Sequence, residues 1–228
     1  MFYGNSKGDV MTRAKYDRID AVEAGLAWSA AFAAYRINGG YFKQPVLNEE
    51  GKIVKPTNRE VAQVARYDAS MITDSDRESA KKARQYMASV TTMNALKGEL
   101  NEWGQISAKV CAQDKITSQY DLAVITAMPH SYTNSLKREE VDARLRKCDG
   151  HIGKVGDKLE VPVEIIRHNY SAKFNTWFIA GITQNNQAVH FAYREAIDPN
   201  RKIVIRGTVK RHTDSSTQLN RVKLVEEA

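Results

Sequence analysis

Basic and apolar residues alternate near the C-terminal end of the sequence, over residues 201–224. Ile203, Ile205 and Val209 fall on one face of an extended strand, and the opposite face is cationic. A polar turn follows, and then a second extended run over residues 217–225. The cationic residues of this hairpin are Lys202, Arg206, Lys210, Arg211, Arg221 and Lys223. Such a row of ammonium and guanidinium groups can bind successive phosphates of a polyanion.

Aromatic residues are interleaved with further basic residues in an upstream segment, RHNYSAKFNTWF. Flat rings can stack on the bases of a single strand while cations bind its backbone. The candidate residues of this segment are Arg167, Tyr170, Lys173, Phe174 and Trp177. Because strand alternation turns only one of Trp177 and Phe178 inward, one large ring must be exposed or covered. The alternative interpretation places Phe174 and Trp177 in a core, beside a basic face that is solvated or contacts a protein.

The sequence shows no spacing of residues that is typical of a catalytic or metal-binding site. No HxxxH or HxH spacing relates the histidines, and Cys111 and Cys148 lack a CxxC motif. Asp74 and Asp76 stand where a helix is expected to begin, so capping explains them. No phosphate-binding glycine loop and no GxSxG motif occurs. We therefore expect two reduced thiols, no metal, no cofactor and no enzymatic activity.

The composition is that of a globular protein with an excess of positive charge. Of 228 residues, 42% are hydrophobic and 27% are charged, and the net charge is +7. Residues 150–228 hold twelve Lys and Arg against eight Asp and Glu, so the smaller C-terminal part is the denser in positive charge. This excess favours a polyanionic partner.

The sequence carries no recognisable targeting or membrane segment. Its N-terminus lacks the apolar stretch of a signal peptide. The longest apolar run, around residues 26–35, falls short of the roughly 20 residues that span a bilayer. We expect a soluble protein of the cytoplasm.

Helical periodicity dominates residues 16–147. A β-hairpin or ordered loop is expected over residues 41–56, which include Pro45. The expected helices are residues 16–37, one capped by Thr57 or Asn58, one headed by Thr73, and residues 99–113, 118–126 (closed at Met128-Pro129) and 135–147. In the helix after Thr73, the residues Arg77, Lys81 and Arg84 share one face, which either binds phosphates or is solvated.

The periodicity changes to that of strands after Gly150. Five strands are expected: 158–168, 176–184, 187–193, 201–212 and 217–225. Gly181 and Gly207 lie within strands, where glycine permits a bulge or a sharp bend. We predict an α+β protein in which a helical domain, residues 1–149, precedes a five-stranded OB-type β-barrel, residues 150–228.

The C-terminal part resembles the OB-fold domains of single-stranded DNA-binding and replication accessory proteins of tailed phages. Strand count, loop placement and the basic fourth and fifth strands carry this resemblance. The segment GTVKRHTDSSTQLNRVKL is similar to a strand-turn-strand ending of tailed-phage proteins, and ITDSDRESAKKARQYM and SYTNSLKREEVDARLRKC are also phage-like. The resemblance implies a role in DNA replication or recombination, in the cytoplasm of the host cell.

The first hypothesis is therefore a non-enzymatic protein that binds single-stranded nucleic acid, with DNA expected before RNA. The helical domain would then mediate oligomerisation or recruit a protein partner. Its segment AWSAAFAAY is apolar on nearly all sides, so it is either buried in the domain or docked on another chain. The alternative hypothesis is a protein-interaction module that binds a host or phage enzyme and modulates it.

Overall fold

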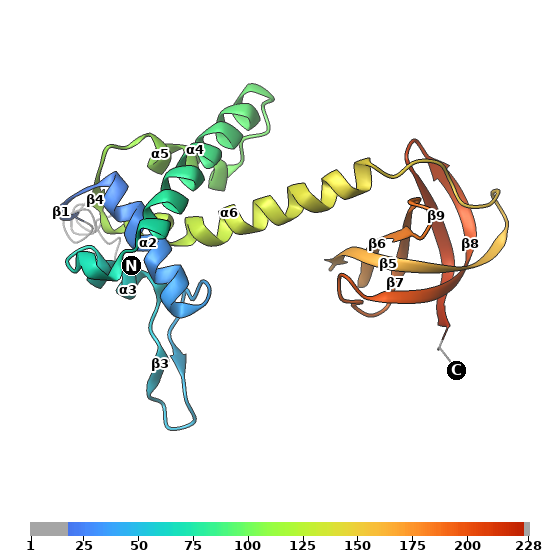
Figure 1. Ribbon diagram of the computed structural model, residues 1–228, viewed down its shortest axis with the longest axis horizontal. Helices are drawn as coiled ribbons and strands as arrows, with labels where there is room; N and C mark the ends of the chain where they lie inside the picture. Colours follow the sequence, from blue (N-terminus) through green and yellow to red (C-terminus); the bar gives the residue numbers. More distant parts are fainter. Residues whose placement is uncertain (1–17, 226–228) are drawn as a thin grey trace, which may run out of the picture. The chain divides into compact units, whose positions relative to one another are not determined.

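The computed structural model describes residues 18–225, and contacts within it divide the chain into two compact units. Of the described residues, 18–135 form one unit, which is mainly helical, and 136–225 form the other, which contains a β-barrel (Figure 1). The predicted fold class, a helical region followed by a five-stranded OB-type barrel, is confirmed. None of the described helices is both long and apolar enough to cross a membrane.

Helix α2 (Ala24–Asn38) lies at the centre of the helical unit. Its alanines at positions 27, 30, 31, 33 and 34 are completely buried, and Trp28 is 1% exposed. Small side chains on every side let neighbouring helices approach closely. These neighbours are α3 (Asn58–Ala65), α4 (Asp74–Leu96), α5 (Glu102–Ala112) and the first part of α6 (Gln119–Arg146). Of the two alternatives for AWSAAFAAY, the structure shows burial within the unit.

The first predicted helix begins too early. Residues 18–23 form strand β1 (Arg18–Glu23), which pairs antiparallel with β4 (Lys115–Ser118), and Tyr16 lies outside the described residues. Val22 on β1 and Ile116 on β4 are both buried, and Ala24 N donates to the Asp114 carbonyl (2.8 Å) at the start of α2. The distant partner β4 decides this conformation, and local periodicity does not reveal such a partner.

The expected end of a helix at Met128-Pro129 is wrong, because α6 continues through Pro129. Proline removes one backbone donor and usually kinks a helix. Here Pro129 is buried, and its carbonyl accepts a hydrogen bond from the Thr133 hydroxyl (2.8 Å). Leu122, Ile125 and Met128 anchor the preceding turns in the core, so tertiary packing holds the helix together.

Capping boxes begin both α3 and α4; the sequence predicts the one at Thr73, and of its two candidates for the cap of α3 the structure shows Thr57. In the capping box of α4, the Asp76 carboxylate accepts from the backbone and the hydroxyl of Thr73 (2.9 and 2.8 Å). Arg36 on α2 also donates to Asp76 (2.9 Å), which joins the two helices. A short 3-10 helix, η1 (Ala69–Met71), precedes this box.

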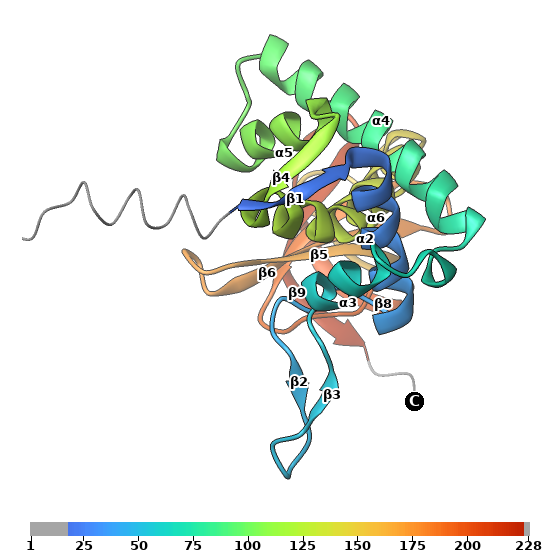
Figure 2. The same cartoon turned by 90° about the vertical axis from the view of Figure 1, so that its left-hand side faces the viewer.

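The predicted hairpin consists of β2 (Val46–Leu47) and β3 (Ile53–Lys55). It projects from the helices of its unit in both views (Figures 1 and 2). The side chain of Asn48 closes its turn by accepting from the backbone of Glu50 and Lys52 (3.1 and 2.8 Å). All its strand residues are exposed, so the hairpin is held mainly by its own turn and its flanks.

The barrel closes in the strand order β5-β6-β7-β9-β8. Only the β7–β9 pairing is parallel, and this arrangement is the Greek-key topology of an OB-type barrel. The bounds are β5 (Lys158–Ser171), β6 (Thr176–Thr183), β7 (Ala188–Tyr193), β8 (Lys202–Thr213) and β9 (Ser216–Val225). The five predicted strands are confirmed to within three residues at each end.

The barrel has three register irregularities: one falls between Val209 and Arg211 of β8, and the other two lie beside Gly181 and Gly207. Of these two, one lies on β5 between Ile165 and Arg167, opposite the Gly181 region of β6. The other lies on β9, where the register shifts between Arg206 and Thr208 of β8 and Arg221 adopts a positive φ of 52°. Glycine at 207 faces this second bulge, because a Cβ there would lie 3.1 Å from the Val222 side chain. The expectation that both glycines accompany irregularities is confirmed.

The last turns of α6 belong to the barrel unit. Asp142 pairs with Arg167 on β5 (2.9 Å), and Arg144 pairs with Glu164 on the same strand (2.9 Å). The division between the units therefore falls at residues 135 and 136, within α6. The predicted boundary at 149 and 150 instead follows the change from helix to strand.

Both cysteines, Cys111 and Cys148, are free and buried. Burial raises the pKa of the Cys111 thiol from 9.0 to about 11. Between these values the folded chain retains a proton that the unfolded chain has lost, so the free energy of unfolding should fall as pH rises. We expect a decrease of up to about 1.4 kcal/mol per pH unit. Denaturant titrations below and within this pH range should show it, and the Cys111→Ala variant should show a shallower pH dependence than the unchanged protein.

Candidate nucleic-acid interface

The basic face of β8 is exposed, but part of its charge is neutralised. Glu160 lies opposite Arg206 in the β5–β8 register, and the two side chains form an ion pair (2.6 Å). Glu164 lies opposite Lys202, but its carboxylate is bound by Arg144. The carboxylate opposite Lys202 is therefore already bound to another cation. The cationic stripe is weaker than the sequence alone indicates.

The remaining cations of the hairpin are exposed as well. Arg211 donates from Nε to the Gln218 side chain (2.7 Å), which orients it without neutralising it. Lys223 lies opposite Arg206 in the β8–β9 register. Within residues 18–225, no carboxylate lies at ion-pair distance from Lys202, Lys210, Arg211, Arg221 or Lys223.

The turn between β5 and β6 presents exposed aromatic rings. Tyr170 is 51% exposed and Phe174 is 62% exposed. The ammonium group of Lys173 lies 5.4 Å from the centroid of the Phe174 ring, and Phe178 meets the same ring edge-on. Arg167 belongs to the same segment, but it is paired with Asp142. The exposed positions are those that could stack on bases.

Trp177 and Phe178 face opposite sides of β6. Trp177 is half-buried and packs against the barrel core, whereas Phe178 is 44% exposed. The prediction that one ring of the two points outward is confirmed. Trp177 also contacts Tyr170, with the ring centroids 5.2 Å apart, and lies opposite Tyr193 in the register. It therefore supports the exposed ring of Tyr170 and has little free surface of its own.

The cationic stripe runs away from the aromatic turn. β8 begins opposite the middle of β5, where Lys202 pairs with Glu164, and continues towards the start of β5. Lys210 stands eight residues further along β8, which corresponds to about 26 Å of extended strand. The structure thus brings Lys202 and Lys223 towards the aromatic turn and leaves Lys210 and Arg211 towards the opposite end.

A groove of about 910 Å³ lies at the end where Lys202 stands. We call it the end groove, and its polar and aromatic lining residues are Tyr193, Arg194, Glu195, Arg201, Lys202 and Lys223. Its one carboxylate, Glu195, is paired with its neighbour Arg194 (3.1 Å). Four cations therefore face one carboxylate. The positive potential of the barrel should be strongest here.

Comparisons of the chain with protein-family models, with curated proteins and with solved structures give no match. Function is therefore inferred from the geometry and charge of the barrel.

The candidate residues predicted from sequence did not include Tyr193, Arg194 and Arg201. They flank the loop between β7 and β8, and pairing of the strands on either side brings them to the end groove. The dipeptide Tyr193-Arg194 at the end of a predicted strand was the available signal. No group of three potential metal ligands occurs in the described part of the chain.

The outer face of β6 and β7, the usual ligand surface of an OB-fold, is largely closed in its middle. Ala180 lies between Arg167 and His190 in the strand registers and is 3% exposed. Burial lowers the pKa of His190, and the nearby Arg167 lowers it further. The imidazole is therefore neutral at pH 7 and adds no cation for phosphate binding. This favours the end groove over the middle of the sheet.

Proposed function

We propose that the barrel binds single-stranded nucleic acid, DNA in the first place, without enzymatic activity. The observation that carries this proposal is the end groove, where four cations surround one paired carboxylate. A role as an accessory factor in replication or recombination, in the cytoplasm of a phage-infected host, fits such binding. Because phosphate contacts and stacking on aromatic rings tolerate any base, we expect an affinity that depends little on sequence.

In this mechanism the phosphates lie along Arg201, Lys202 and Lys223. Bases stack on the exposed rings of Tyr170 and Phe174, at the same end of the barrel. Each stacked base is expected to contribute about 1–3 kcal/mol. Trp177, in contact with Tyr170, keeps that ring in place.

A titration of fluorescent oligo-dT at several salt concentrations tests the proposal. Each neutralised phosphate of a single strand contributes about −0.7 to the slope of log K against log salt, so three contacts predict a slope near −2. Fluorescence anisotropy of the full chain measures this slope. No binding at low salt, or binding that salt leaves unchanged, would refute the proposal.

Protein binding is a second candidate function, and the β2–β3 hairpin favours it. Val46, Leu47, Ile53 and Val54 are between 38% and 60% exposed on this projecting hairpin. Exposed apolar side chains grouped on one element are typical of protein-interaction sites. The partner would be a host or phage enzyme or a second copy of the chain. A photoreactive group at Val54 would capture such a partner, and oligo-dT binding would then be absent or independent of the capture.

A further inference from the structure

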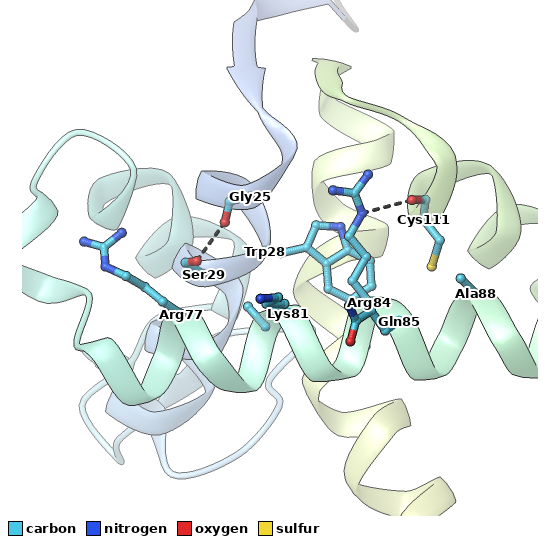
Figure 3. A pocket seen from close by; sticks show the side chains of 10 residues that line it. Gly25, Trp28, Ser29, Arg77, Lys81, Arg84, Gln85, Ala88 and Cys111 are labelled. Atoms are coloured by element: carbon cyan, nitrogen blue, oxygen red, sulfur yellow. Dashed lines mark hydrogen bonds between the residues drawn. The ribbon is translucent and has the colours of Figure 1, made fainter.

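A cavity of about 580 Å³ lies in the helical unit, between α2, α4 and α5 (Figure 3). Its apolar wall is formed by Trp28 of α2, by Ala80 and Ala88 of α4, and by Cys111 of α5. The volume is within the range of sites that hold small organic molecules. The barrel contributes no residue to it.

Three cations of α4 stand at this cavity: Arg77, Lys81 and Arg84. They are the basic helix face identified in the sequence. Their spacing of four and three residues places them in a row of about 10 Å along the helix. No Asp or Glu is among the residues that line the cavity. The three cations therefore line a concave surface and do not lie on an open, solvated helix face.

The positive charge of this row is poorly neutralised. The carboxylate nearest to Arg77 is that of Asp74, at 3.9 Å and fully exposed, and a pair of this kind contributes little. Lys81 has no ion pair with any residue of the range 18–225. Arg84 donates to the backbone carbonyls of Cys111 (2.9 Å) and Gln113 (2.6 Å). These bonds fix the guanidinium group but leave its charge uncompensated.

The wall also contains an unused hydrogen-bond donor. Trp28 is 1% exposed, and its indole Nε1–H has no acceptor among the described residues. A buried donor without an acceptor is uncommon in folded proteins and destabilises them. The neighbouring Ser29 hydroxyl donates to the Gly25 carbonyl (2.7 Å) but accepts no hydrogen bond from the indole.

We propose that this cavity binds a small organic anion. A flat apolar body lies against Trp28, Ala80 and Ala88, and the acidic group, a phosphate, sulfonate or carboxylate, is bound by Arg77 and Lys81. Charge-assisted hydrogen bonds of this kind are stronger than neutral ones. A cavity of about 580 Å³ has the size of a small-molecule site, so its ligand is distinct from the strand proposed for the barrel.

The test uses 8-anilinonaphthalene-1-sulfonate, an aromatic sulfonate whose fluorescence is sensitised by tryptophan. In the full chain with Trp103→Phe and Trp177→Phe, Trp28 is the only tryptophan. We expect saturable energy transfer from Trp28 to one bound dye. Lys81→Glu should weaken binding about 10-fold or more, equivalent to about 1.4 kcal/mol. Lys82→Glu, the same charge change on an exposed residue outside the cavity, should leave it within about 2-fold.

Two further arms test the charge and the kind of ligand. The neutral analogue N-phenyl-1-naphthylamine should bind at least about 10-fold more weakly than the sulfonate. Oligo-dT should not displace the dye. Equal effects of Lys81→Glu and Lys82→Glu, or equal binding of the neutral analogue, would overturn the proposal. Displacement by oligo-dT would do so too, since the cavity would then belong to a nucleic-acid surface.

A second measurement needs no tryptophan substitution. Cys111 lines the cavity, whereas the other thiol, Cys148, is in the barrel unit. The bound dye should slow alkylation of Cys111, followed by mass spectrometry of its peptide, and leave the alkylation rate of Cys148 unchanged. Equal protection of both thiols, or of neither, would contradict binding in the cavity.

Discussion

Replacing Gly181 with alanine should destabilise the barrel by about 3 kcal/mol. A Cβ at this position would lie 2.2 Å from Val163 Cγ1 and 2.9 Å from the Glu164 carbonyl oxygen. The Val163 side chain could rotate, but Glu164 presents backbone, and the adjacent bulge of β5 is part of the barrel closure. Chemical denaturation followed by circular dichroism measures the loss.

Two other glycines provide matched controls. At Gly207 the new Cβ would contact Val222 at 3.1 Å, so we expect a cost of about 1 kcal/mol. At Gly25, on α2, no atom lies within 4 Å, and alanine should be neutral or stabilise the helix by up to about 1 kcal/mol. Equal losses at Gly181 and Gly25 would show that the close approach to β5 is not what requires glycine.

Removing the cations of the end groove should abolish most nucleic-acid binding. Combined substitution of Arg201, Lys202 and Lys223 by alanine is expected to lower oligo-dT affinity about 100-fold at moderate salt, because three phosphate contacts are lost. The slope of log K against log salt should become flatter by about 2. Anisotropy titrations over the same salt series measure both quantities.

The control removes the same number of charges at the other end of the barrel. Combined substitution of Lys158, Lys210 and Arg211 by alanine changes the net charge equally, but these exposed residues do not line the groove. Affinity should fall less than about 5-fold, through the long-range field alone. If both triple variants lose affinity equally, the charge acts diffusely. A larger loss in the control would move the site towards the β8–β9 turn.

Local pattern was sufficient to predict the barrel but insufficient for parts of the helical unit. Strand alternation is a local signal, and the five strands were predicted nearly in full. The β1–β4 pair joins residues almost a hundred positions apart, and nothing near Arg18 in the sequence reveals that partner. The predicted helix end at Pro129 was wrong for a related reason, because buried contacts of α6 override a local helix breaker.

The sequence predicted which types of residue form the candidate site, but it did not predict how they are arranged in space. The sequence shows Arg206 and Arg167 as free cations, but Glu160 pairs with the first from 46 positions away and Asp142 with the second from 25. Arg201 and Tyr193 become neighbours of Lys223 only through the strand order of the barrel. The fold decides which charges are neutralised by ion pairs and which residues come together. The order of charges along the sequence shows neither.

The bulge on β9 sets barrel stability and surface charge against each other. Arg221 occupies it with φ at 52°, a conformation that costs a non-glycine residue about 1 kcal/mol or more. Glycine would relieve this strain and would also remove an exposed guanidinium group. A search for more stable variants of this chain would therefore tend to select the loss of Arg221, and with it the loss of one positive charge from the barrel surface. At this position thermal robustness and positive surface charge are competing demands on one side chain.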